Sequence, residues 1–517
     1  MAFTKAPMAD SHNVQRILPP LQPILTSSTT TVSATAAYID CFPLKEEQWQ
    51  GQPIIGIHKR EGWGSTTATG TTLTGTYAGY SVAQSTNVNY PKVFYTFGAG
   101  LYMFDYSTNV NSLISNTATG NYRGTLTNAI NSTNTRKIVC LEGGGTPYLT
   151  MCDEDGTNVT TTSLAAIGVD GVKGLVYING YLFAVNTLGN KIYNSNAGGV
   201  LTTWTSTDFL DAEQYADPIM YIEKHHNYLV AFGTSSIEFF YDNAVEIGSP
   251  LARQESYSTQ VGILLGNGGN FTTNGRLVAK HADDLYFLGC SPTVVGSLYR
   301  IRNFKVEEIN TPSYIKGILN SSSYGSIILH SNWINNNPCV VVELLNSGGT
   351  YAYMVEEDCW FKINGADYPQ TATGIVGVPF VTQNTIGTGV PGVYALTGSN
   401  GAYPKKWQHD ATVSVTAIIN HPIQDLGVNR WKALHRVDLV GDYGTNTVSL
   451  TMGKSMNYES GGSISCGSQT QSTIGYEANM SWYKIGSFRQ FWPSISISGT
   501  APAIHRAVEV EYDVGAS

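Results

Sequence analysis

Short apolar runs separated by tight turns recur along most of this chain. The clearest example is Tyr228–Tyr241, where an apolar run, a Gly-Thr-Ser-Ser turn and an aromatic-rich second run predict a β-hairpin. Similar patterns occupy Leu175–Val185 and Asp284–Gly289. A chain built from repeated antiparallel hairpins is usually a propeller or another closed array of small sheets. The pattern therefore predicts an all-β protein with a propeller-like array of antiparallel blades, which we assign to residues 45–409.

Each recurring piece of this region combines an apolar strand, a Gly or Asn turn and a second strand with aromatic residues. The pieces are Val93–Phe104, Ile138–Met151, Leu175–Trp204, Met220–Asp242, Asp284–Ile309, Val340–Phe361 and Val393–Leu396. Their spacing of roughly 40–50 residues is typical of propeller blades, and we expect about five to seven of them. The Tyr and Phe side chains are expected to fill the gaps between blades rather than to form a carbohydrate platform.

The pattern changes near Trp407, after which apolar and polar residues alternate with a period of two. Such alternation predicts half-buried strands. They are expected at Val413–Ile419, Ala433–Val440, Val448–Met452, Ser494–Ser498 and Val508–Tyr512. Together these strands predict a C-terminal β-sandwich, or platform, domain at residues 410–517.

Residues 1–44 have the composition of an extended arm. Pro19, Pro20 and Pro23 exclude a regular helix, and Thr26–Thr35 is a low-complexity, β-branched stretch. Such a segment buries little surface by itself. We therefore expect the arm to pack as an added strand on the C-terminal sandwich or on a neighbouring molecule.

Charged residues make up only 13% of the 517 residues, and the net charge is −9. The chain has no lysine-rich run, which argues against sequence-specific DNA binding through a basic patch. Mild acidity is compatible with DNA contact without adhesion. The low charge has two explanations: a surface covered by neighbouring molecules, or an exposed surface of uncharged Ser, Thr and Asn.

The seven cysteines are widely spaced and form no Cys-x-x-Cys pair, so buried free thiols are expected. Free thiols fit folding in a reducing cytoplasm. The N-terminal residues lack the apolar core of a secretory signal, and no apolar run is long enough to span a bilayer. We therefore expect no membrane insertion.

Several motifs superficially suggest chemistry. Gly387–Gly392 fits Gly-x-Gly-x-x-Gly, but a strand rather than a helix is expected after it, so a turn is favoured over a dinucleotide site. His225 and His226 are adjacent, and adjacent side chains on a strand point to opposite faces, which argues against a shared metal ion. Asp153–Gly156 resembles the start of a calcium loop, but a hairpin turn explains it better.

A propeller glycosidase needs paired carboxylates, usually with arginines, facing the axial pocket. Arg300 and Arg302 lie close in sequence to Glu307 and Glu308, but the repeated boxes of sialidase propellers are missing. We expect no catalytic, cofactor-binding or metal-binding residues, and no enzymatic activity.

Four segments, in order along the chain, carry a family resemblance. They are Ala37–Leu44, which contains Tyr-Ile-Asp, Ile57–Trp63, Phe232–Phe240 and Trp482–Arg489. They resemble the tail hub or nozzle proteins of short-tailed bacteriophages, also called packaged-DNA stabilisation proteins. The third segment resembles a mid-chain blade hairpin most closely. The chain departs from that family in a Thr/Ser/Gly-rich insertion at Gly64–Asn89.

The resemblance implies a homohexameric virion tail protein, assembled in the host bacterial cytoplasm. It implies a position below the portal and its head-to-tail adaptor, contact with tail fibre, tailspike or needle proteins, and no catalysis or cofactor. An axial channel would retain packaged double-stranded DNA and let it pass during ejection. Six copies would carry a net charge of about −54.

Candidates for acidic residues facing that channel are Glu356, Glu357, Asp358, Asp283 and Asp284, although exposed turns explain them equally well. Two other functions stay open from the sequence alone. One is a propeller glycoside hydrolase acting on the host surface, and the other is a monomeric carbohydrate-binding adhesin.

Overall fold

A computed structural model describes most of the chain as two compact units. The described residues are 13–19, 38–49, 52–74, 78–86, 92–98, 100–115, 124–143, 146–212, 215, 217–244, 248–264, 277–292, 296–320, 327–344, 349–364, 380–382, 392–397, 401–422, 424, 426–427, 430–455, 463–470 and 480–514. The propeller unit comprises Trp63–Ala352 and Gly365–His409. The sandwich unit comprises Met1–Gly62, Tyr353–Asn364 and Asp410–Ser517.

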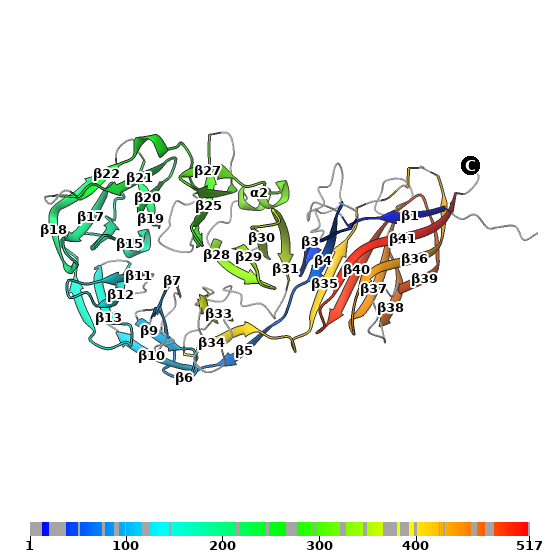
Figure 1. Cartoon of the computed structure of the whole chain (residues 1–517), viewed down its shortest axis with the longest axis horizontal. Coiled ribbons are helices and arrows are strands. Elements are labelled where there is room, and N and C mark those ends of the chain that lie inside the picture. The colour runs from blue at the N-terminus through cyan, green and yellow to red at the C-terminus, as the bar shows by residue number, and fades with distance from the viewer. Residues whose placement is uncertain are drawn as a thin grey trace, which may run out of the picture. The chain divides into compact units, whose positions relative to one another are not determined.

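The described part of the propeller unit contains seven blades of mostly antiparallel strands, arranged around a common centre (Figure 1). The first three are β6 (Thr69–Gly70), β7 (Ala78–Gln84), β8 (Lys92–Phe97), β9 (Gly100–Asp105) and β10 (Val110–Ser115); β11 (Thr125–Ile130), β12 (Arg136–Leu141), β13 (Tyr148–Asp153) and β14 (Thr160–Ser163); and β15 (Leu175–Ile178), β16 (Tyr181–Val185), β17 (Lys191–Asn196) and β18 (Val200–Asp211).

The fourth blade contains β19 (Ile219–His225), β20 (Tyr228–Gly233), β21 (Ile237–Asp242) and β22 (Leu251–Arg253), and the fifth β23 (Gly262–Ile263), β24 (Val278–His281), β25 (Asp284–Cys290), β26 (Ser297–Arg302) and β27 (Lys305–Glu308). The sixth contains β28 (Ile327–Ile334), β29 (Asn337–Leu344) and β30 (Gly349–Met354), and the seventh β32 (Phe380–Thr382), β33 (Gly392–Thr397), β34 (Lys405–His409) and β5 (Trp63–Thr67). Short helices are η1 (Gly171–Lys173), η2 (Glu255–Tyr257) and α2 (Ser313–Asn320). Among the described helices, none has the length and apolar content needed to cross a membrane.

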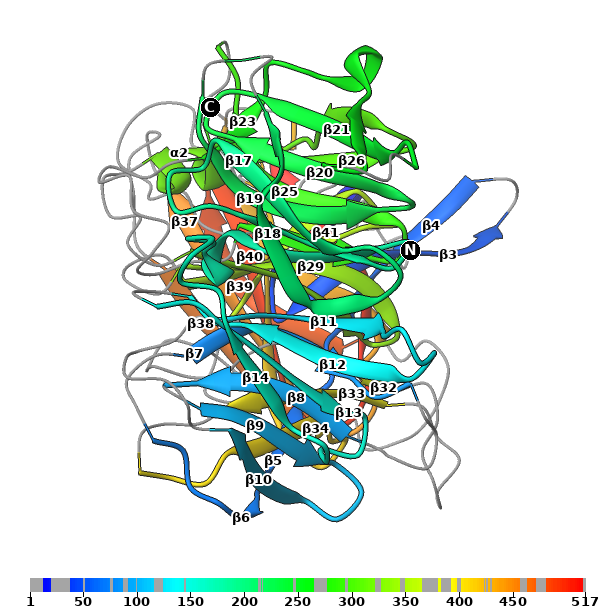
Figure 2. The same cartoon turned by 90° about the vertical axis from the view of Figure 1, so that its left-hand side faces the viewer.

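Strands that are neighbours in sequence pair within each blade, as β8, β9 and β10 do (Figure 2). Two-residue turns with positive φ join several of them, for example Asn179-Gly180 and Asn335-Asn336, and such turns match the twist of a hairpin. Apolar clusters fill the space between successive blades. The Phe232 and Phe287 rings of the fourth and fifth blades lie 5.3 Å apart. The prediction that aromatic residues form the blade core is confirmed.

Residues 63–74 close the propeller, and we call them the clasp. Their strand β5 pairs with β34 of the last blade, and β6 then pairs with β10 of the first blade. The Asn111 carboxamide accepts a hydrogen bond from the Tyr95 hydroxyl at 2.6 Å and donates one to the Thr71 carbonyl at 2.7 Å. The clasp lies largely in the Gly64–Asn89 insertion, so this insertion joins the first and last blades.

Gly70 in the clasp has a φ of +96°, and a Cβ there would lie 2.2 Å from the Asn111 carbonyl oxygen. We expect Gly70→Ala to lower the free energy of unfolding by about 3 kcal/mol, since left-handed strain alone costs about 1–2 kcal/mol and the clash adds to it. Gly168 also has a positive φ but open space around it, so Gly168→Ala should show the strain cost alone. Urea unfolding of both variants measures the difference. Equal losses would contradict the role of the clasp.

The sandwich unit consists of two sheets. One contains β3 (Cys41–Trp49), β4 (Gln52–Lys59), β41 (Ile504–Val514), β36 (Lys432–Asp442) and β39 (Met480–Phe488) in that order, with β1 (Asn13–Ile17) also paired to β41. The other has the order β31 (Cys359–Ile363), β2 (Tyr38–Ile39), β35 (Val415–Asn420), β40 (Gln490–Gly499), β37 (Thr447–Ser455) and β38 (Ser463–Thr470). The Phe42 and Phe361 rings of the two sheets lie 5.3 Å apart.

All five period-two segments predicted after Trp407 form strands of this unit. The unit also takes residues 45–62, which the sequence analysis placed in the propeller domain, because β3 and β4 join the sheet of β41. Of the described residues of the arm, Asn13–Ile17 form β1, which pairs antiparallel with β41 as expected for an added strand, and residues 38–39 and 41–44 belong to β2 and β3 of the same unit. Residues 1–12 and 20–37 of the arm lie outside the described residues.

Two buried histidines lie between the two sheets. His421 Nε2 is 3.3 Å from His505 Nε2, and the Tyr443 hydroxyl is 2.7 Å from His505 Nδ1. Burial lowers the pKa of His421 to about 4, although the backbone of Leu18 opposes this shift. Burial, with a further contribution from His421, also holds the pKa of His505 well below its ordinary value. Both rings are therefore neutral at pH 7.

Because an unfolded histidine has a pKa near 6.5, the unfolded chain binds protons between pH 6.5 and about 4 that the folded chain does not. The stability of the sandwich unit should fall across this window, by about 3 kcal/mol for His421, and this histidine should contribute no pH dependence above it. Urea unfolding at pH 7.5, 6, 5 and 4 tests the sign. His421→Phe should flatten the profile, whereas Tyr443→Phe keeps both imidazoles and should retain it. An unchanged profile in His421→Phe would refute the assignment.

Candidate functional site: the propeller axis and the acidic turns

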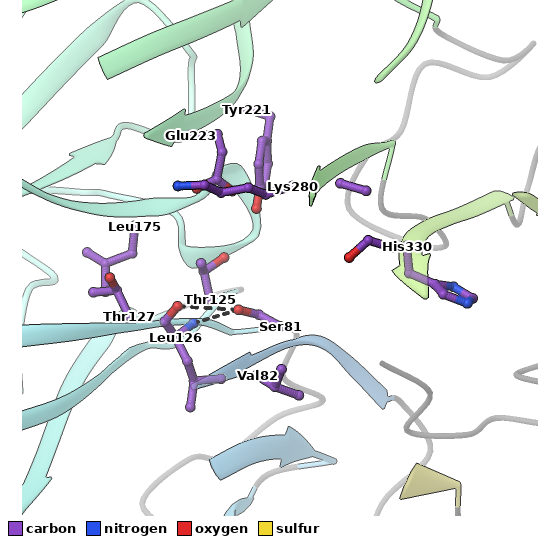
Figure 3. Close-up of a pocket in the computed structure, with 12 residues that line it drawn as sticks. Ser81, Val82, Thr125, Leu126, Thr127, Leu175, Tyr221, Glu223, Lys280 and His330 are labelled. Atoms are coloured by element: carbon purple, nitrogen blue, oxygen red, sulfur yellow. Dashed lines mark hydrogen bonds between the residues drawn. The ribbon is translucent and has the colours of Figure 1, made fainter. Parts of the chain in front are cut away.

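The first candidate site is a cavity at the centre of the propeller, with a volume of ≈ 250 Å³. Strands β7, β11, β15, β19, β24 and β28, from six different blades, form its wall. Figure 3 shows these residues around the cavity, with hydrogen bonds between Ser81 and the backbone of Leu126. The lining residues are Ser81, Val82, Thr125, Leu126, Thr127, Leu175, Tyr221, Glu223, Ala279, Lys280, His330 and Ser331.

Charges of both signs line this cavity. Glu223 comes from β19 and Lys280 from β24, and the His330 imidazole lies 3.8 Å from the Glu343 carboxylate. Burial lowers the pKa of neighbouring Lys224, and the positive charge of Lys280 lowers it further. Among the described residues, the wall of this cavity is therefore polar and mixed in sign rather than uniformly acidic.

The cavity of ≈ 250 Å³ is lined by one copy of the chain and is of the order of a small-molecule pocket, which typically has about 300–1,000 Å³. Among the described residues, this cavity is therefore no evidence for a DNA conduit through one propeller.

The second candidate site is the set of acidic residues proposed to face a channel, and the structure places them on two different hairpin turns. Asp283 lies in the turn between β24 and β25 of the propeller unit and Asp284 is the first residue of β25, shortly after Lys280 of the cavity wall in the chain. Asp283 is exposed, whereas the Asp284 carboxylate is 2.5 Å from Arg302. None of the five acidic residues is among the described residues that line the cavity.

The other three acids form the turn between β30 and β31, in the sandwich unit. The Lys45 ammonium lies 3.6 Å from the Glu357 carboxylate, and the Tyr353 hydroxyl donates to Asp358 at 2.8 Å. Glu356 is exposed. Of the five candidates, Asp283 and Glu356 thus make neither a side-chain ion pair nor a side-chain hydrogen bond within the described parts of the chain. Whether these side chains face a channel stays a prediction.

The residues that would have suggested a glycosidase form ion pairs at the outer edge of the fifth blade. The Arg300 guanidinium is 2.9 Å from Glu307 across β26 and β27, and Lys305 is 2.9 Å from the same carboxylate. Hydrogen bonds from Lys305 and Arg300 lower the pKa of Glu307 to about 2, the opposite of what a general acid requires. The Lys316 ammonium is 2.6 Å from Glu308. These carboxylates lie on β27, away from the strands that line the axis.

The expectation that His225 and His226 point apart was wrong, because their ring centroids are 4.4 Å apart. His226 lies in the turn after β19 with a φ of +52°, so strand alternation does not apply to it. Phe304 packs edge-on against the His225 ring, at 5.2 Å. Among the described residues, no three His, Cys, Asp or Glu side chains converge as a metal site requires.

Two further motifs from the sequence are the calcium-loop-like Asp153–Gly156 and the Gly-x-Gly-x-x-Gly match at Gly387–Gly392. Asp153–Gly156 forms the turn between β13 and β14, as predicted. Residues 387–391 of the Gly-x-Gly-x-x-Gly match lie outside the described residues, and the strand expected after them is β33.

The Gly-Thr-Ser-Ser turn of the most characteristic hairpin surrounds a carboxylate that sequence reasoning missed. Asp217 accepts hydrogen bonds from the backbone N–H groups of Ser235 and Ser236 at 2.7 and 3.1 Å, and from the Ser236 hydroxyl at 2.7 Å. A Cβ at Gly233 would lie 2.3 Å from this carboxylate. The Asp217-Pro218 dipeptide signals a turn, but the sequence does not show that it caps a turn further along the chain.

A second missed contact joins two of the segments that carry the family resemblance. Asp40 of the Tyr-Ile-Asp element accepts a hydrogen bond from the Arg60 guanidinium at 2.7 Å, and both side chains are buried. The Asn364 backbone N–H also donates to Asp40, at 3.0 Å. The carboxylate of Asp40 thus connects its own segment with those of Arg60 and Asn364, so these residues have a structural role.

The family model described as bacteriophage P22 Gp10, beta-propeller, matches residues 56–387, nearly two thirds of the chain. This chain belongs to that family. It is therefore a structural tail protein of a bacteriophage, and its seven blades have the propeller fold that the family description names. The match covers the described strands from within β4 to β32. No curated protein matches this chain.

Solved structures with a similar arrangement have low sequence identity. Raptor from Chaetomium thermophilum is 13% identical with a TM-score of 0.41, over 68% of this chain and 29% of that one. A chain of the mitotic checkpoint complex is 11% identical with a TM-score of 0.38, over 67% and 94%. YCF48 bound to D1 peptide is 9% identical with a TM-score of 0.37, over 67% and 94%. The chain thus spans less than a third of the Raptor chain.

We expect Asp217→Ala to lower the free energy of unfolding by about 2–3 kcal/mol, because two backbone donors and a hydroxyl lose a charged acceptor. Asp217→Asn keeps one acceptor oxygen and should cost less. Asp208→Ala is the control, since within the described residues Asp208 accepts a single long hydrogen bond, of 3.4 Å from neighbouring Thr207, and its cost should stay within about 0.5 kcal/mol. Denaturant unfolding measures all three. A loss in Asp217→Ala no larger than the control's would contradict this account of the turn.

Proposed function

We propose that this protein forms a homohexameric tail nozzle below the portal–adaptor complex, and that the lumen between its copies retains packaged DNA and lets it pass during ejection. The match of residues 56–387 to a phage tail family carries this proposal. The described cavity at the propeller axis, of ≈ 250 Å³, gives no evidence for a passage through one copy, so the proposal places the lumen between copies.

The charge distribution suits transit rather than binding. Several of the few cations are paired with carboxylates, as Arg302 is with Asp284 and Arg300 with Glu307. Paired cations attract phosphates weakly, so a duplex can move past such a wall without adhering. Contacts with the adaptor and with fibre, tailspike or needle proteins complete the proposed setting, together with assembly in the host cytoplasm.

The proposed role is mechanical and involves no catalysis. Glu307 and Glu308, the acids nearest to a glycosidase pattern, are held ionised by lysine and arginine partners and lie on an outer strand. The Asp217 and Asp40 carboxylates cap a turn and bind a buried arginine. These four acids thus have structural partners.

Mass photometry and negative-stain electron microscopy of the purified protein test the assembly. The expected result is a six-fold ring whose opening admits a duplex. A monomer that releases sugars from host envelope would favour a hydrolase instead, and a monomer that binds glycan without turnover would favour an adhesin.

A charge-reversal experiment tests which acids face the lumen. Glu356→Lys and Asp283→Lys each replace six negative charges with six positive ones in a ring of six, which raises the net charge by about twelve. The lumen-facing variant should bind double-stranded DNA at least tenfold more tightly than the wild type at 50 mM salt, and lose most of this gain near 200 mM. Fluorescence anisotropy with a labelled duplex measures the affinity.

Glu255→Lys is the matched control, because Glu255 is an exposed acid outside the candidate set. If the control gains as much affinity as both test variants, overall charge rather than position is responsible, and neither acid is assigned to the lumen.

A further inference from the structure

Two segments pair with one edge of β41, and the N-terminal arm is the one that pairs with residues 508–512. Along its other edge β41 pairs with β36 over nearly its whole length. On the arm side, β4 pairs with β41 only at Ile504 and His505, while β1 pairs with Val508–Tyr512. Without β1 this stretch would present unpaired backbone groups, which are a ready site for an added strand. We call Val508–Tyr512 the arm slot.

The arm is held in its slot by backbone pairing between β1 and β41 and by two buried side chains. Ile17 is 5% exposed and Pro19 is buried, whereas Val14 and Leu18 are 68% and 65% exposed. The Arg16 guanidinium lies 3.8 Å from Glu509, and both side chains are partly exposed, so this ion pair adds little. Any identical strand with the same two anchors would fit the slot equally well.

The chain between β1 and β2 is long enough to reach another molecule. Residues 20–37 separate the described end of the arm from Tyr38, and this many residues span up to about 60 Å when extended. The arm slot can therefore be filled from the same chain or from a neighbour through identical contacts.

We propose that in the assembled ring β1 occupies the arm slot of a neighbouring copy, so that each subunit is tied to the next by strand exchange. This inference rests on the proposed ring. In a ring, the arm slot of the neighbouring copy is held close to the arm. Its effective concentration around the arm therefore allows it to compete with the slot of the arm's own chain. Exchange would also place the exposed Val14 and Leu18 side chains at the boundary between two subunits, where the neighbouring subunit can bury them.

Disulfide trapping of single-cysteine variants tests the exchange. Val14 and Glu511 are register partners on β1 and β41, and Cα atoms of antiparallel partners lie within disulfide range. Chains carrying Val14→Cys and chains carrying Glu511→Cys, with different tags, are coexpressed, and the complex is oxidised. The expected result is a disulfide-linked dimer containing both tags on a non-reducing gel. The double variant should give a ladder of up to six chains.

Ala433→Cys with Asp513→Cys is the matched control, because these residues are partners on β36 and β41, two neighbouring strands that do not involve the arm. The double control should close within one chain, and the coexpressed single controls should give no dimer. The wild type, whose seven cysteines are free, gives the background.

Ile17→Asp supplies a second test that does not depend on disulfide formation. With exchange, loss of this buried anchor should lower the fraction of rings at least fivefold at fixed protein concentration in mass photometry. Strand exchange would be refuted if Ile17→Asp left the ring fraction unchanged. It would also be refuted if the Val14→Cys, Glu511→Cys double variant formed rings with disulfides only within single chains. Neither result would contradict the ring itself. Monomers in the wild type would overturn the proposed function.

Discussion

Closure of the propeller depends on the hydrogen bonds that hold the clasp between the last and the first blade. Each blade buries large apolar faces against its neighbours, so an open array would leave two such faces in water. Ala68 and Leu73 of the clasp are buried in the core cluster of the first blade, while β5 completes the last. Asn111 links these parts, because its carboxamide binds both Tyr95 and Thr71. The cavity at the axis exists because this ring closes.

The segments that mark this family in sequence serve the scaffold. Asp217 caps the Gly-Thr-Ser-Ser turn, and Asp40 with Arg60 joins two of the characteristic elements. A buried ion pair contributes little net stability compared with apolar residues, but removing one partner leaves an uncompensated charge and is strongly destabilising. Such residues therefore specify one arrangement of strands. This use of charged residues fits a protein whose function follows from its shape.

Much of the fold could be predicted from local pattern, since hairpins and period-two strands depend on neighbouring residues. The β38 strand was missed because its Ser, Gly and Gln residues alternate only weakly between exposed and half-buried. His225 and His226 were misjudged because a positive φ in a turn overrides strand alternation. The partners of Asp217 and Asp284 are distant in sequence, at Ser235 and Arg302, so no local pattern reveals them. For the same reason, the sequence identified five acidic candidates for a channel surface but could not show which of their carboxylates form ion pairs.

The low charge of the chain is explained in part by the composition of its outer strands. Edge strands usually carry lysine or other charges that block unwanted pairing. Here the outer strand β14 is Thr-Thr-Thr-Ser, and the edge strand β38 is Ser-Ile-Ser-Cys-Gly-Ser-Gln-Thr, with both largely exposed. Uncharged hydroxyl and amide groups keep these edges soluble without adding cations. A phosphate backbone near such a surface meets few unpaired positive charges, which removes the largest sequence-independent attraction between protein and DNA.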